Sequence, residues 1–137
     1  MSYKERAQSW YKRAIMETDE FLKFVLLFIA VEALLEGQKI YALKTKPRLL
    51  ETIDPKDISI LREALDARPH QNMDADGDQT WNGRLESDTD WIGIILFLAR
   101  ARNNLFHGDK AYDEERDIFI VTYGNKMIEP IVKNLLS

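Results

Sequence analysis

Three side chains within residues 102–107 have types and spacing suited to phosphate chemistry: Arg102, Asn103 and His107. Asn103 and His107 are four residues apart and would share one face of a helix, with Arg102 about 100° from Asn103 around the same helix. Arginine makes bidentate hydrogen bonds to phosphate oxygens, and histidine can transfer protons near neutral pH. The group is therefore a candidate site for phosphodiester chemistry.

RNA supplies its own nucleophile for such a reaction, the 2′-hydroxyl. His107 could remove its proton or protonate the leaving oxygen, and Arg102 could stabilise the negative charge of the transition state. Asn103 could orient the imidazole or the phosphate. This scheme requires no metal ion and no cofactor, and the chain has no cysteine for a thiolate site.

The segment RNNLFHG at 102–108 follows an apolar stretch and resembles the Arg-x(4–6)-His signature of HEPN domains, including the polar residue that this family favours after the arginine. The region 10–35, with AVEALL at 30–35, is similar to the family's first helices. The resemblance implies an all-α bundle that usually dimerises and brings two motif copies together in a cleft. It assigns catalytic roles to Arg102, Asn103 and His107.

The same resemblance implies an endoribonuclease that acts as a toxin or defence effector on RNA. Many HEPN proteins are paired with a nucleotidyltransferase-type antitoxin protein, and others have lost their activity. The alternative is therefore a non-catalytic HEPN-like module that binds a nucleotide or a partner. A third interpretation is purely structural: Arg102 lies on the predicted buried stripe of Trp91, Ile95 and Leu98, and it would be buried in an ion pair with Glu32.

The first half of the chain contains elements that would support this site. Residues 3–36 lack glycine and proline and predict one long helix or two abutting ones, with a break at Thr18 and Asp19 and a stop at Gly37. Two shorter segments follow at 38–43 and 48–51. Asp54 as a cap and Pro55 in the first turn then predict a helix that ends before Pro69.

In the second half, the motif is predicted to end a helix that begins near Thr89 and Asp90 and runs to about Phe106. A last helix is predicted over 113–136. The branched residues 118–123 resemble a strand, however, and Gly124 and Pro130 interrupt the helical pattern. The prediction is one all-α domain, 1–137, an antiparallel helical bundle of about four main helices plus short ones, with mixed α/β as the alternative.

The composition favours a globular protein over a membrane or a secreted one. The chain has 45% hydrophobic and 31% charged residues, as in ordinary globular proteins. Its longest apolar stretch, 24–35, contains Glu32 and is shorter than the about 20 residues that span a bilayer, so no membrane contact is expected. The charged N-terminus lacks the pattern of a secretion signal, so we expect a cytoplasmic protein. The net charge of −4 means that RNA would have to bind through a local patch.

Residues 68–88 are polar and predict a long surface loop. His70 is expected to be exposed there. Asp74, Asp76 and Asp78 resemble the start of a calcium loop, but Gln79 and Leu85 replace its required glycine and glutamate, which predicts a solvated acidic loop and no metal site. The tryptophans at 10, 81 and 91 and Tyr11 are expected to pack rather than to stack on bases.

Overall fold

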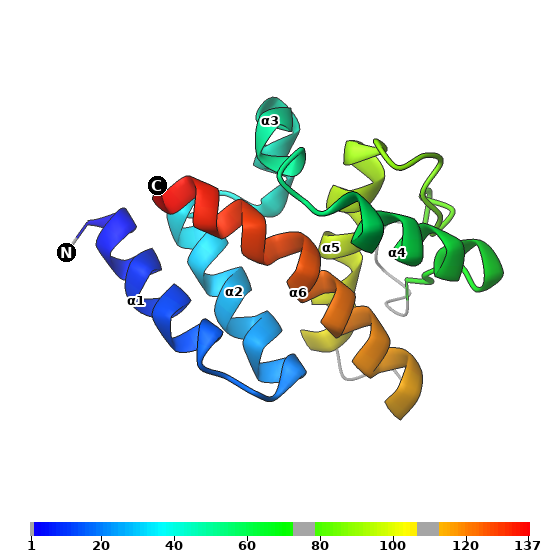
Figure 1. The fold of residues 1–137 in the computed structure, drawn as a ribbon, viewed down its shortest axis with the longest axis horizontal. Helices are drawn as coiled ribbons and strands as arrows, with labels where there is room; N and C mark the ends of the chain where they lie inside the picture. The colour runs from blue at the N-terminus through cyan, green and yellow to red at the C-terminus, as the bar shows by residue number, and fades with distance from the viewer. Residues whose placement is uncertain (1, 73–78, 107–112) are drawn as a thin grey trace.

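The described part of the protein, residues 2–72, 79–106 and 113–137 of a computed structural model, contains helices and no strand (Figure 1). The elements, in chain order, are α1 (Tyr3–Ile15), α2 (Glu20–Leu34), the 3-10 helix η1 (Ile40–Thr45), α3 (Pro47–Leu50), α4 (Pro55–Ala67), α5 (Trp91–Phe106) and α6 (Glu114–Leu136). The all-helical prediction is confirmed for these residues. None of the described helices is long and apolar enough to cross a membrane.

Short polar side chains start the helices where the sequence predicts. The Asp19 carboxylate accepts hydrogen bonds from the backbone N–H groups of Phe21 and Leu22 and so caps α2. Asp54 caps α4 through the N–H of Lys56, and Asp90 accepts from the N–H of Gly93 in the first turn of α5. These bonds satisfy N–H groups that have no partner within the helix, which fixes the helix starts locally.

The last element is a single helix, which confirms the helix predicted over 113–136 and excludes the strand-like alternative at 118–123. α6 runs from Glu114 through Gly124 and Pro130 without a break. Gly124 is a packing position, because a Cβ built there would lie 2.6 Å from the Phe24 ring on α2. Burial of branched side chains such as Ile120 and Val121 in this helix outweighs their preference for strands.

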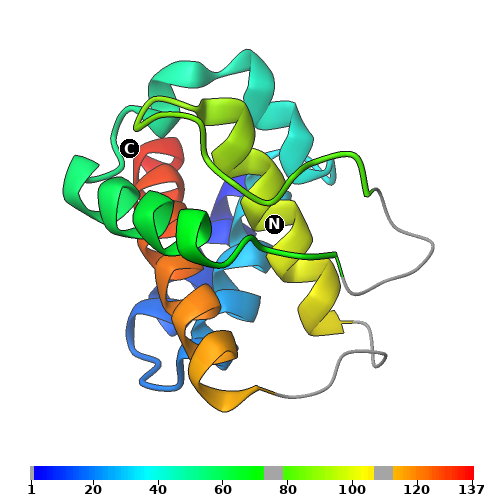
Figure 2. The ribbon, with the colours of Figure 1, turned by 90° about the vertical axis from the view of Figure 1, so that its right-hand side faces the viewer.

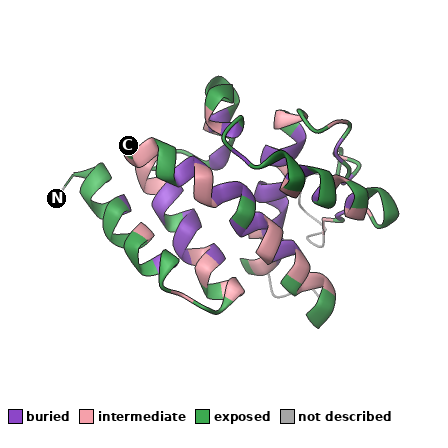
Figure 3. Ribbon diagram, viewed as in Figure 1, coloured by how far each residue is buried: buried purple, intermediate pink, exposed green. Residues whose placement is uncertain are grey.

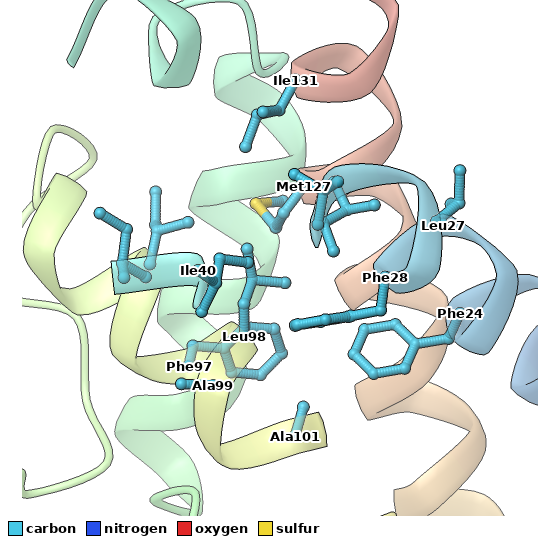
Figure 4. Packing of buried hydrophobic residues seen from close by; sticks show 14 of the residues in the cluster. Phe24, Leu27, Phe28, Ile40, Phe97, Leu98, Ala99, Ala101, Met127 and Ile131 are labelled. Atoms are coloured by element: carbon cyan, nitrogen blue, oxygen red, sulfur yellow. The ribbon is translucent and has the colours of Figure 1, made fainter. Parts of the chain in front are cut away.

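α1 and α2 form an antiparallel pair, α6 packs along α2, and α5 lies on the far side of α6 (Figure 1). The core lies between α2, α5 and α6, where Phe24, Phe28, Leu98 and Met127 converge (Figure 4). By contrast, α1 buries only Ala7 and Ala14 and is exposed along most of its length (Figure 3).

Candidate functional site

Arg102 lies in the last turn of α5, on the same face as Ile95 and Leu98. Those two side chains are fully buried, whereas the Arg102 side chain is 39% exposed, so the expectation that Arg102 is buried is wrong. Helical periodicity fixes the face on which a residue lies but not how far neighbouring elements cover that face. Neighbouring elements cover less of α5 towards its C-terminal end, where Phe106 is exposed.

The ion pair between Arg102 and Glu32, which the purely structural interpretation predicts, is present. Nε of Arg102 donates to Oε1 of Glu32 at 3.1 Å, which joins the end of α5 to the last turns of α2. The Phe106 ring covers the guanidinium, with 5.0 Å from the guanidinium carbon to the ring centroid. Arg102 is thus held at one edge by a carboxylate and at one face by an aromatic ring.

Arg102 has two further nitrogens, Nη1 and Nη2, beside the one that contacts Glu32. Within the described residues, neither Nη1 nor Nη2 of Arg102 makes a hydrogen bond. A guanidinium presents its donors in a flat fork, and the edge formed by its two Nη atoms fits two oxygens of a phosphate. The site can therefore bind an oxyanion without first breaking the contact with Glu32.

Of the other two predicted site residues, Asn103 is described by the structure and His107 is not. Asn103 follows Arg102 in the last turn of α5, is partly buried, and makes no side-chain hydrogen bond within the described residues. His107 lies outside the described residues. The structure therefore places Arg102 and Asn103 side by side on one helix end, and the position of the imidazole remains a prediction of the motif.

A second polar group on α5 was not predicted. Arg100, 7% exposed, donates through Nη1 to the backbone carbonyls of His70 at 2.8 Å and Trp81 at 3.1 Å, and its guanidinium lies over the Trp81 ring. Nδ2 of Asn104 donates to the carbonyl of Gln71 at 2.9 Å and lies 3.3 Å from Nε2 of His70. His70 is buried, so its predicted exposure is wrong.

These contacts hold the segment between α4 and α5 against α5, as Figure 2 shows where that segment crosses the helix. The N–H of His70 also donates to the carbonyl of Gly83 at 3.0 Å, which pins two parts of the segment together. The predicted surface loop is thus partly an interior element, with Gly83 and Leu85 buried. The predicted acidic residues Asp74, Asp76 and Asp78 lie outside the described residues.

A sequence signal for this second group exists. Gly93, Phe97, Arg100 and Asn104 are spaced by four, three and four residues and form a second buried stripe on α5. This stripe lies on a different face of α5 from the stripe of Ile95 and Leu98. Because Arg100 donates to backbone carbonyls and is covered by Trp81, we interpret this group as structural.

A separate hollow of about 340 Å³ lies between α1 and the end of α6. Tyr11, Lys12 and Lys133 are among the residues that line it. Burial, together with the nearby Glu129 carboxylate, raises the pKa of Tyr11. The hollow contains none of the predicted site residues.

We expect Arg100→Met to lower the free energy of unfolding by about 2–4 kcal/mol, because two backbone carbonyls lose a charged donor. Chemical denaturation followed by circular dichroism measures this change. Arg48→Met, at an exposed arginine of α3, is the matched control and should have little effect. Equal stabilities of the two variants would contradict the structural role of Arg100.

Comparisons of the chain with protein-family models, with curated proteins and with solved structures find no match. The resemblance to HEPN domains therefore depends on the residues of this chain alone, chiefly on Arg102, Asn103 and His107.

Proposed function

We propose that this protein is a metal-independent endoribonuclease of the HEPN type that acts as a toxin or defence effector. The observation that supports this function best is the state of Arg102. Its guanidinium lies on the half-exposed end of a buried helix, with two nitrogens free of hydrogen bonds to the described residues, directly before Asn103 and five residues before His107.

In the proposed reaction, His107 takes the proton of the RNA 2′-hydroxyl or supplies one to the leaving 5′-oxygen. The 2′-oxygen attacks the phosphorus, and the bond to the 5′-oxygen breaks. The Nη edge of Arg102 stabilises the charge that builds up on the phosphate oxygens, and Asn103 orients the phosphate or the imidazole.

The proposed enzyme is a homodimer, and an apolar strip beside the site supports this part of the proposal. Leu22, Val25 and Ile29 recur every three or four residues along α2, and Glu32 continues the same strip. Leu22 is 41% exposed, Ile29 36% and Phe106 52%, so apolar surface flanks the ion pair from both helices. A second copy that covers this surface would convert the half-exposed Arg102 into part of a cleft.

The alternative proposal is a non-catalytic HEPN-like module that binds a nucleotide or an antitoxin protein. The Glu32 carboxylate favours it, because it already neutralises part of the charge of Arg102. Phosphate or partner binding without any RNA cleavage, in EDTA as well as in magnesium, would support this alternative.

We expect His107→Ala and Arg102→Ala each to reduce RNA cleavage by about 10²–10⁴-fold, because each removes a group that acts in the transition state. Cleavage of a labelled single-stranded RNA by purified protein in EDTA measures this. Arg13→Ala, at an exposed arginine of α1, is the control for loss of a positive charge and should cleave normally. Circular dichroism checks the fold of each variant, and undiminished cleavage by His107→Ala would refute the proposal.

For the dimer, we expect Ile29→Glu to convert the protein to a monomer and to reduce cleavage with it, because a charge would be buried in the interface. Light scattering coupled to size-exclusion chromatography gives the mass. Ile60→Glu on α4, at an isoleucine that is 46% exposed, is the matched control. A fully active wild-type monomer, or identical masses of the two variants, would exclude this interface.

A further inference from the structure

The contact between Glu32 and Arg102 divides the donors of the guanidinium into two sets. Nε is engaged by Oε1 of Glu32 at 3.1 Å, whereas Nη1 and Nη2 make no hydrogen bond within the described residues. The Phe106 ring lies against one face of the same group. A long, flexible side chain is thereby restricted at one edge and one face, and only the edge opposite Glu32 remains for a ligand.

The backbone of Glu32 is itself fixed. Its carbonyl accepts a hydrogen bond from the N–H of Gly37 at 2.9 Å, where α2 ends. Gly37 has a φ of 83°, in the left-handed region that glycine adopts without strain. The carboxylate thus projects from a capped helix end, which makes it a suitable anchor for a second side chain.

Stability alone does not explain this ion pair. The two side chains are 39% and 35% exposed, and ion pairs with that much solvent contact contribute little to folding. The pair between Lys23 and Glu129 is comparable: it joins α2 to α6 at 3.6 Å, with side chains 20% and 36% exposed. It provides a matched control that has no connection to Arg102.

We infer that Glu32 is a positioning residue, which holds Arg102 so that its Nη1 and Nη2 atoms face the phosphodiester of a bound RNA. This inference rests on the proposed function. The phosphate and the carboxylate then occupy opposite edges of one cation, and Glu32 stays in place during the reaction. Glu32 acts through Arg102 and does not touch the substrate.

Two substitutions separate the effect of the hydrogen bond of Glu32 from the effect of its charge. Glu32→Gln keeps an oxygen that accepts from Nε but removes a negative charge near the phosphate, so kcat should stay within about threefold of wild type while KM falls. Glu32→Ala frees the guanidinium and should lower kcat by about 10–100-fold. Glu129→Ala should change neither constant.

The first experiment is steady-state RNA cleavage by wild type and these three variants, with the folded fraction of each measured by circular dichroism. A loss in Glu32→Ala that Glu32→Gln rescues supports the positioning role. Kinetics of Glu32→Ala that match those of Glu129→Ala would overturn it while the proposed function stands. Faster cleavage by Glu32→Ala would also overturn it, because Glu32 would then compete with the phosphate.

The second experiment does not depend on cleavage. It follows the Arg102 Nε–H signal by NMR as a 2′-O-methyl oligoribonucleotide, which cannot be cleaved, is added to the protein. We expect a slowly exchanging Nε–H in wild type and Glu32→Gln, lost in Glu32→Ala, and retained when the oligonucleotide binds. Loss of this signal on binding would show that the phosphate displaces Glu32 and would overturn the inference, whether or not the wild type cleaves RNA. Absence of both binding and cleavage in wild type would reject the proposed function and the inference with it.

Discussion

The burial of α5 is the constraint on which the rest of the structure depends. More than half of its residues are buried, and Ile94, Ile95, Phe97 and Leu98 are fully enclosed by neighbouring elements. A helix that is covered on most sides cannot leave polar side chains without partners at low cost. Arg100 and Asn104 therefore bind backbone carbonyls of the segment between α4 and α5, whereas Arg102 lies in the last turn of α5, where its side chain is partly exposed.

This constraint also explains why two arginines only two residues apart have different roles. Two residues correspond to about 200° around a helix, so Arg100 and Arg102 face opposite sides of α5. Arg100 is enclosed by backbone carbonyls and Trp81, and its donors serve the fold. Arg102 meets one carboxylate at the rim of the core and keeps two nitrogens free of hydrogen bonds within the described residues, which is the state that a phosphate-binding arginine requires.

Sequence reasoning succeeded where local chemistry determines the structure. Asp54 caps its helix as predicted, and helices begin at the predicted break at Asp19 and near Asp90, because a carboxylate two or three residues before an N–H group acts within one turn. The ion pair of Arg102 with Glu32 follows from the structural interpretation, in which both residues lie on predicted core stripes. The predictions that failed, the exposure of His70 and the burial of Arg102, depend on contacts between distant segments. The choice between the predicted helix over 113–136 and the strand-like alternative at 118–123 depends on such contacts too, and the structure has the helix. Composition and spacing do not specify which element covers a given face.

We propose that the chain cleaves RNA by attack of the 2′-oxygen, with its own side chains and without a metal ion. The most direct measurement is the chemical identity of the product ends after incubation of purified protein with single-stranded RNA in EDTA. We predict ends that carry a 2′,3′-cyclic phosphate and a 5′-hydroxyl, and no cleavage at a site where the 2′-hydroxyl is replaced by hydrogen. Intact RNA, or products with a 3′-hydroxyl and a 5′-phosphate, would contradict this mechanism.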